Sequence, residues 1–302
     1  SMGAHHPNAN TAAVTFNCIL SRGAQMTSNP SNHARYGGPE MAIDGPKTAL
    51  IQTLLSRRSC RDFSDRVIDH QTKHLLFTAA QSAPTKSNLQ QYSLIEIADP
   101  SIRQSLQQLF PSVTWAISAP LLVVIVGDLH RTQQINAAKG HEFRWDAADA
   151  FLNASVDASL ALGFMIAAAE SLSLGSCPIS TIRESTAAII RLLELPKGTF
   201  PICACAFGYP TQKHTTVSPR LPQSVVVHRD RYQPVDMDAI HGYDQTLTEV
   251  MGEPKPRYPE RYGMPRESTW SDNLARQTSV RERSDFQSSC EQQGLWRRDQ
   301  MD

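Results

Sequence analysis

The hydrophobic pattern separates a polar start of the chain from a periodic body. Apolar positions recur at helical spacing or form short continuous runs from residue 46 onward. This pattern predicts helices at 44–59, 69–83, 100–110, 146–175, 183–196, 235–251 and 269–286. Strands are predicted at 92–99, 120–128 and 200–210, and the continuous apolar run at 120–128 indicates a strand buried on both faces. Such an order of elements predicts an α+β fold with helices packed over a sheet.

The helix predicted at 146–175 has apolar or small residues on every face. A helix that is apolar all round is typically buried on all sides. In a chain of 302 residues this indicates a subunit interface along the helix, and an ordinary central core helix is the alternative.

The pattern also suggests where the folded part begins. Residues 1–45 are rich in Asn, Ser, Ala, Gly and Pro, and the opening "SMG" resembles a cleavage scar, so a disordered extension is expected there. A transit peptide is a second interpretation, because acidic residues are absent before Glu40. Residues 46–252 form the expected main domain. Residues 253–302 are expected to add a proline-rich arm and a helix to the same fold.

Composition narrows the function classes. The 29 basic and 29 acidic residues give no net charge, which argues against nucleic acid and membrane surfaces as partners. The six cysteines contain no CxxC pair, so neither a zinc site nor a disulfide framework is expected, and a reduced, cytoplasmic location is inferred. His70 and His74 have the spacing of metal ligands, but without a third ligand a solvated helix face is the simpler interpretation and no metal is expected.

The sequence has none of the common catalytic motifs. It lacks GxGxxG, the P-loop, GxSxG and HExxH, which leaves a binding protein or an enzyme whose cofactor performs the chemistry. The segment "RRSCRDF" (57–63) concentrates three arginines, and Arg220 follows in "SPRLP". Arginine forks suit phosphate oxygens, although a solvated surface would also explain the cluster. The loop "SAPTKSNLQ" (82–90) offers hydrogen bonds to a flat ring.

Taken together, five segments resemble the flavin-dependent nitroreductases. They are "RRSCRDFSD", "SNLQQYSLIEI", "SVDASLALGFMIAAAESLSLG", "PRLPQSVVVHRDRYQP" and "STWSDNLARQ". The last two are similar to the NADPH-dependent, oxygen-insensitive nitroreductase and flavin reductase branch. This resemblance implies a mostly antiparallel central sheet flanked by helices. It also implies an intertwined homodimer with two FMN molecules at its interface, each held by both subunits.

The resemblance implies a set of cofactor-binding residues. The phosphate and ribityl chain would contact Arg57, Arg58, Ser59, Arg61, Ser218 and Arg220. The ring would contact Thr85, Lys86, Ser87, Asn88, Gln90, Pro178, Ile179, Ser180 and Thr181. This sequence departs from the family pattern at three places. Ser218 replaces a lysine, Ser180 and Thr181 replace glycines, and Val113 replaces a glutamine. The flavin environment is therefore expected to differ from that of the family, and Arg57 would offset the charge lost at Ser218.

The implied activity is hydride transfer from NADPH to FMN and then to a small acceptor in a ping-pong cycle. Nitroaromatics, quinones and free flavin are the expected acceptors, and Lys86, Ser87 and Arg220 are candidate stabilisers of the flavin or substrate. Arg257, Arg261 and Arg266 in the arm would contact the 2′-phosphate of NADPH, or else are solvated. A reductase or dehydrogenase specialised for one metabolite and a non-catalytic flavin-binding protein remain as alternatives.

Overall fold

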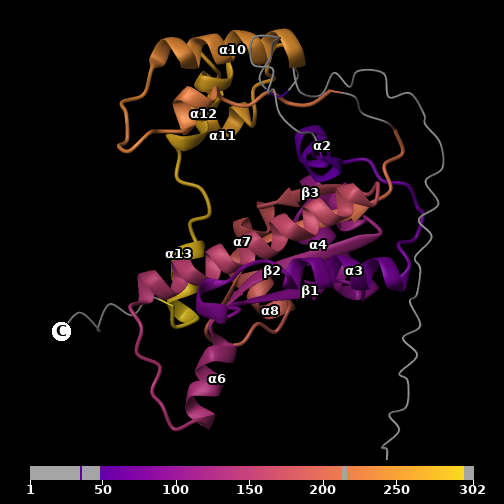
Figure 1. Cartoon of the computed structure of the whole chain (residues 1–302), viewed down its shortest axis with the longest axis vertical. Helices are drawn as coiled ribbons and strands as arrows, with labels where there is room; N and C mark the ends of the chain where they lie inside the picture. Colours follow the sequence, from indigo (N-terminus) through magenta and orange to yellow (C-terminus); the bar gives the residue numbers. More distant parts are fainter. Residues whose placement is uncertain (1–34, 36–47, 213–215, 296–302) are drawn as a thin grey trace, which may run out of the picture. The chain divides into compact units, whose positions relative to one another are not determined.

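The computed structural model describes residues 35, 48–212 and 216–295, so the expectations for residues 1–34 and 36–47 lie outside the described residues (Figure 1). The described chain is built on one four-stranded antiparallel sheet with strand order β1-β2-β4-β3. Its strands are β1 (Tyr92–Glu96), β2 (Leu121–Asp128), β3 (Gly175–Ile179) and β4 (Thr199–Gly208). The predicted α+β architecture is confirmed.

Strand β2 lies inside the sheet between β1 and β4, and all eight of its residues are buried. Consecutive side chains of a strand point to opposite faces, so a strand covered on both sides must be apolar throughout. Leu121 is opposite Phe207 and Ile125 is opposite Cys203 in the pairing with β4. The prediction of a strand buried on both faces is therefore confirmed.

Helices α3 (His70–Gln81) and α7 (Ala147–Ser171) cover one face of the sheet (Figure 1). Asp69 caps α3, accepting a hydrogen bond from the backbone N–H of Thr72 at 2.8 Å. The core on this side joins Leu76 of α3 and Met165 of α7 to the side chains of β2 and β4.

The opposite face is covered by α4 (Pro100–Leu109), α5 (Thr114–Ile117) and α8 (Thr186–Leu192), with the short 3-10 turns η3 (Pro111–Val113) and η4 (Thr181–Ser185). Leu106, Ile117 and Ile189 pack there against the other set of β2 and β4 side chains. The sheet is thus the middle layer of three.

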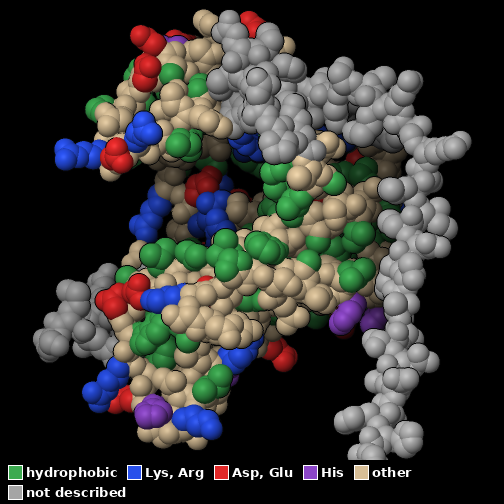
Figure 2. All heavy atoms as spheres, in the orientation of Figure 1, with side chains coloured by type: hydrophobic (Ala, Val, Ile, Leu, Met, Phe, Trp, Pro, Cys, Tyr) green, Lys and Arg blue, Asp and Glu red, His purple; other side chains and the backbone are tan. Residues whose placement is uncertain are grey.

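Helix α7 has two apolar faces that differ in burial. Its small residues, such as Ala154 and Ala158, are fully buried against the sheet. On the other side, Leu152, Val156, Leu160 and Phe164 recur every four residues and are 38–59% exposed. Figure 2 shows a row of hydrophobic side chains along this helix. By length and composition α7 could cross a membrane, but its contacts with β1, β2, β3, β4 and α3 place it in the core of this fold.

Several predicted elements needed correction. Three elements were not predicted from the sequence: β3, α6 (His130–Ala138) and α13 (Phe286–Gln292). A single helix at 269–286 was wrong, because α12 (Trp270–Thr278) ends early and Arg283 has a φ of 52°. The remaining elements are α2 (Ala49–Ser56), η2 (Lys86–Asn88), α9 (Gln223–Val226), α10 (Met237–Met251) and α11 (Pro259–Tyr262).

Candidate functional site

The arginine segment that follows α2 runs beside β3. Ser59 forms a parallel bridge with Ser176, and the Cys60 N–H donates to the Ser176 carbonyl at 2.9 Å. The approach is so close that a Cβ on Gly175 would lie 2.5 Å from the Cβ of Cys60, so glycine is required there. The structure therefore brings the Arg57–Arg61 segment next to the strand that ends in Pro178 and Ile179.

The guanidinium groups of this segment have no acidic side chain in direct contact within the described part of the chain. Arg57 donates to the Ser59 hydroxyl at 3.2 Å, and its Nε is buried with no hydrogen-bond partner among the described residues. Within the same described part, Arg57, Arg58, Arg61 and Arg220 form no salt bridge. Buried donors and uncompensated positive charge favour an anionic ligand.

One carboxylate lies behind the arginines, at the end of α7. Burial raises the pKa of Glu170, while a hydrogen bond from Ser176 and the charges of Arg57 and Arg58 act in the opposite direction. The Ser176 hydroxyl donates to Glu170 at 3.1 Å. Burial is the larger effect, so the pKa of this carboxyl is above its ordinary value although two arginines lie nearby.

The segment containing Ser218 and Arg220 joins the arginine segment through a residue that the sequence analysis missed. Arg35 is 8% exposed, and its guanidinium donates to the carbonyls of Leu55, Arg57 and Ser218. Its own carbonyl accepts the N–H of Arg220 at 2.8 Å. Arg35 lies within the segment expected to be disordered, and nothing in its local pattern signalled this role.

The loop before β1 has a specialised backbone. Ser87, Asn88 and Gln90 have φ values of 47°, 59° and 53°, a left-handed conformation that is uncommon outside glycine. Asp157 of α7 is fully buried and accepts the backbone N–H groups of Lys86 at 2.9 Å and Gln91 at 3.0 Å. Asp157 was missed, although it is the one charged residue between Asp149 and Glu170 in the sequence.

Three further side chains, those of Arg131, Asp149 and Trp145, contact this loop. Arg131 donates to the carbonyl of Gln90 at 2.9 Å. The Nζ of Lys86 lies 3.3 Å from Asp149 and 4.9 Å from the centre of the Trp145 ring. Thr85 precedes the 3-10 turn in an extended conformation. The loop is therefore ordered by its own chain.

The arginine segment and the loop lie at different ends of α7. Asp157, which holds the loop, and Glu170, beside the arginines, are 13 positions apart, or about 20 Å along a helix. The sheet also separates them. The loop leads into β1 and the arginine segment pairs with β3, and these two strands form opposite edges of the sheet. Within a single chain the predicted residues thus form two separate groups, one at the arginine segment and one at the loop before β1.

Comparison with known proteins identifies the fold. The model of the "Nitroreductase family" matches residues 54–209, and that of the "Nitroreductase family, C-terminal domain" matches residues 218–298. The chain belongs to the nitroreductase family. The match covers more than half of the chain, which confirms the resemblance seen in the sequence.

Named relatives cover most of this nitroreductase. It is 33% identical over 207 residues to "FMN reductase [NAD(P)H]" of Bacillus subtilis, covering 67% of this chain and 82% of the relative. It is 31% identical to "Oxygen-insensitive NADPH nitroreductase" of Salmonella typhimurium, covering 78% and 93%. The solved structure titled "NADPH:FMN oxidoreductase from Vibrio harveyi complexed with NAD+" aligns with a TM-score of 0.72 at 28% identity, covering 82% and 98%.

The nitroreductase accommodates its sequence departures in different ways. Ser180 has an ordinary φ of −91°, and its hydroxyl accepts a hydrogen bond from Arg283 at 3.1 Å, so no glycine is needed here. Thr181 begins η4 and is partly buried. Val113 is 9% exposed and belongs to the core beside β2.

The arm arginines of the nitroreductase have separate surroundings. Arg261 lies 3.9 Å from Glu184, and the backbone N–H of Arg266 donates to Asp272. Arg257 lines a pocket of about 420 Å³ with Trp270. No hydrogen bond or ion pair recorded for the described residues joins the three arginines, and whether they contact NADPH stays a prediction.

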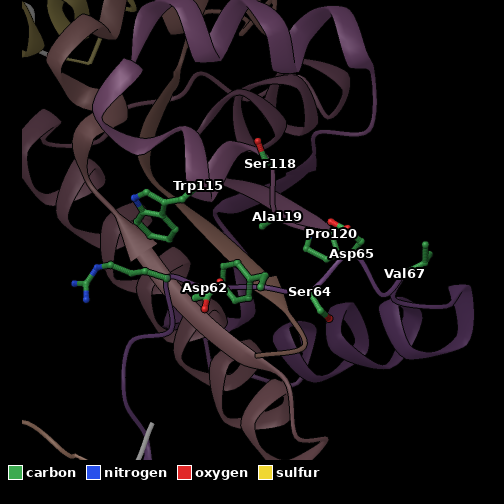
Figure 3. A pocket seen from close by; sticks show the side chains of 10 residues that line it. Asp62, Ser64, Asp65, Val67, Trp115, Ser118, Ala119 and Pro120 are labelled. Atoms are coloured by element: carbon green, nitrogen blue, oxygen red, sulfur yellow. The ribbon is translucent and has the colours of Figure 1, made fainter. Parts of the chain in front are cut away.

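A pocket of about 350 Å³ adjoins the arginine segment (Figure 3). It is lined on one side by Arg61 and the residues after it, and on the other by Trp115 and residues 118–120, which directly precede β2. Asp62 and Asp65 line it as well, so its charge suits a phosphate poorly. We therefore place the anion site on the side of Arg57 and Ser59.

Proposed function

We propose that this nitroreductase is an FMN-dependent NADPH oxidoreductase that reduces small planar acceptors by two electrons. The observation that carries the proposal is the uncompensated arginine group beside β3, in a chain whose relatives include a named NADPH nitroreductase and a named FMN reductase. Nitroaromatics, quinones and free flavin are the proposed acceptors.

The described residues fit FMN by their chemistry. The buried Nε of Arg57 lacks a partner that a phosphate oxygen would supply. Arg58 and Arg220 would add positive charge, whereas Arg61 lines the pocket that also contains Asp62 and Asp65. The left-handed turns at Ser87, Asn88 and Gln90 reorient the backbone of a loop that hydrogen bonds already hold in place, as a site for a flat ring requires. When bound, FMN would supply hydride acceptance and donation. The protein would orient both substrates and, through Lys86 and Arg220, stabilise negative charge.

We further propose a homodimer in which each site takes its arginine group from one subunit and its loop from the other. The two groups lie about 20 Å apart along α7 in one chain. Leu160 and Phe164 lie between them, and Leu152 and Val156 continue the same exposed apolar row toward the start of α7. A two-fold axis across this row would place the loop of one copy near the arginines of its partner, because such an interface is self-complementary.

The first experiment is an absorbance spectrum of the purified protein, followed by anaerobic addition of NADPH and, separately, NADH. Flavin bands near ~370 and ~450 nm that bleach faster with NADPH are the expected result. A protein that retains no flavin and takes up no added FMN would overturn the proposal. Flavin that neither nucleotide reduces would favour the non-catalytic flavin carrier.

Mixing two inactive variants tests the shared site. Arg57→Ala/Arg58→Ala removes the arginine group, and Asn88→Val strains the loop, because a β-branched residue resists a φ of 59°. In a shared site, one of the two sites in each mixed dimer is intact, so random exchange restores about a quarter of all sites. No restoration under conditions where mixed dimers form would show that each site belongs to one chain.

A specialised reductase of one metabolite is the second candidate. The contact between Ser180 and Arg283 favours it, since it places a charged side chain of the C-terminal region beside the segment predicted to flank the flavin. Turnover of only one acceptor from a panel of quinones and nitroaromatics would support this candidate. A cytoplasmic location is proposed from the five described cysteines, which are all free.

A further inference from the structure

Arg35 joins two parts of the proposed anion site although it precedes both regions matched to the family. The first family match begins at residue 54 and the second at residue 218. Arg35 hydrogen-bonds to residues at the start of each match, namely Leu55, Arg57 and Ser218. Its position between them is the observation from which the inference starts.

The hydrogen bonds of Arg35 form a connected set with the site arginines. Its Nη2 donates to the carbonyls of Leu55, at 2.9 Å, and Arg57, and so fixes the backbone where α2 ends and the arginine segment begins. Its Nη1 donates to the carbonyl of Ser218 at 3.3 Å, and its backbone carbonyl accepts from the N–H of Arg220. One residue thus orients both Arg57 and Arg220.

The positive charge of Arg35 lies next to Ser218 and Arg220. The carbonyl of Ser218 accepts from Arg35 and from Arg220, each at 3.3 Å, so both guanidinium groups lie at one oxygen. The Ser218 side chain itself is uncharged. Arg35 is 8% exposed, and an interaction between charges is stronger where water is excluded.

We propose that Arg35 is a positioning residue of the phosphate site: it aligns Arg57 with Arg220 and supplies positive charge beside Ser218. This inference rests on the proposed FMN site. In this chain the anion site is then built from Arg35 and two segments, residues 57–61 and 218–220. Arg35 would supply a positive charge beside the uncharged serine at position 218.

The test compares FMN with riboflavin, which has the same ring and lacks the phosphate. Fluorescence titration of the flavin-free protein gives the Kd of each flavin. Arg35→Ala is expected to weaken FMN binding by about tenfold or more, as hydrogen bonds involving charged groups suggest, and to change riboflavin binding less than about twofold. Arg35→Lys keeps the charge and loses the forked geometry, so an intermediate Kd for FMN is expected.

Arg191→Ala is the matched control, because Arg191 is an exposed arginine in the last turn of α8. It should leave the Kd of both flavins unchanged. Circular dichroism and thermal unfolding establish that each variant folds. Should Arg35→Ala not fold, Arg35→Lys alone provides the comparison of the two flavins.

Two results would overturn the role of Arg35. Equal weakening of FMN and riboflavin would show a general structural role, and unchanged FMN binding would show no role. A wild-type protein that binds FMN no more tightly than riboflavin would instead contradict the phosphate site itself. The failure of this inference is therefore distinguishable from the failure of the proposed function.

Discussion

The two ends of α7 are organised by opposite electrostatic means. Near Asp157, one buried carboxylate accepts two backbone N–H groups and fixes the loop at residues 85–90. Near Glu170, the guanidinium groups of Arg57 and Arg58 lie beside one carboxyl group whose pKa is raised by burial. At the loop, backbone N–H groups find their acceptor within the same chain. At the arginine segment, the Nε of Arg57 remains a buried donor without an acceptor among the described residues. Their difference suggests that one end is preorganised and that the other is completed by its ligand.

The largest effect on the free energy of unfolding is expected from Asp157, which holds the loop. Asp157→Ala leaves two backbone N–H groups without an acceptor, and each such group costs about 1–3 kcal/mol. We expect the free energy of unfolding to fall by about 2–5 kcal/mol in urea denaturation. Asp149→Ala, which removes an exposed ion pair, should cost less than about 1 kcal/mol. Equal losses for the two variants would contradict the preorganised loop.

At the arginine end the effect should appear in ligand binding. Arg220→Ala is expected to weaken FMN binding about tenfold, measured by fluorescence titration, and to leave the unfolding midpoint of the flavin-free protein nearly unchanged. Because Arg220 and Arg35 share the carbonyl of Ser218, the double variant should lose less than the sum of the single losses. Strict additivity would show that the two residues act separately.

A smaller effect concerns pH. The folded-state pKa of Glu170 is raised, so the unfolded chain ionises first as pH increases and the native state loses stability through that window. Glu170→Gln removes this loss and keeps an acceptor for the Ser176 hydroxyl. The stability of the variant relative to wild type should therefore increase from pH ~4 upward and level off above the folded-state pKa. A constant difference across this range would contradict the assignment.

The smallest effect is expected away from both ends, at the contact of Arg283 with Ser180. Arg283→Ala removes this hydrogen bond and an ion pair with Glu282, so a stability change of about 1 kcal/mol is expected in urea denaturation. Ser180→Gly, its matched partner, should have a similar small effect. If instead either variant abolished flavin binding, this contact would belong to the cofactor site.

Strong local signals explain what the sequence predicted correctly. β2 is a continuous apolar run, and α7 is a long stretch of helix-forming residues that ends before Gly175. The sequence also identified the segment at 57–61, because its arginines are adjacent. These features depend on neighbouring residues, which is the information that a single sequence contains.

The rest depends on contacts between distant segments. β3 is only five residues long and contains Gly175 and Pro178, so nothing in its pattern indicates a strand; its pairing with β4 creates it. Arg35 lies in a polar segment, and its role comes from carbonyls 20 to 183 positions away. The buried Asp157 was visible in the sequence, but the N–H groups it binds were not.

Because α7 contacts both the loop at residues 85–90 and the arginine segment, its length has a meaning separate from its composition. Each residue inserted between Asp157 and Glu170 would lengthen the spacing by about 1.5 Å and rotate the ends by about 100° relative to each other. A substitution on this stretch would change only the local packing. An insertion or deletion would move Asp157 or Glu170 away from its hydrogen-bond partners. In the proposed site the helix therefore acts as a spacer of fixed length, and its number of turns sets the distance between the loop and the arginines.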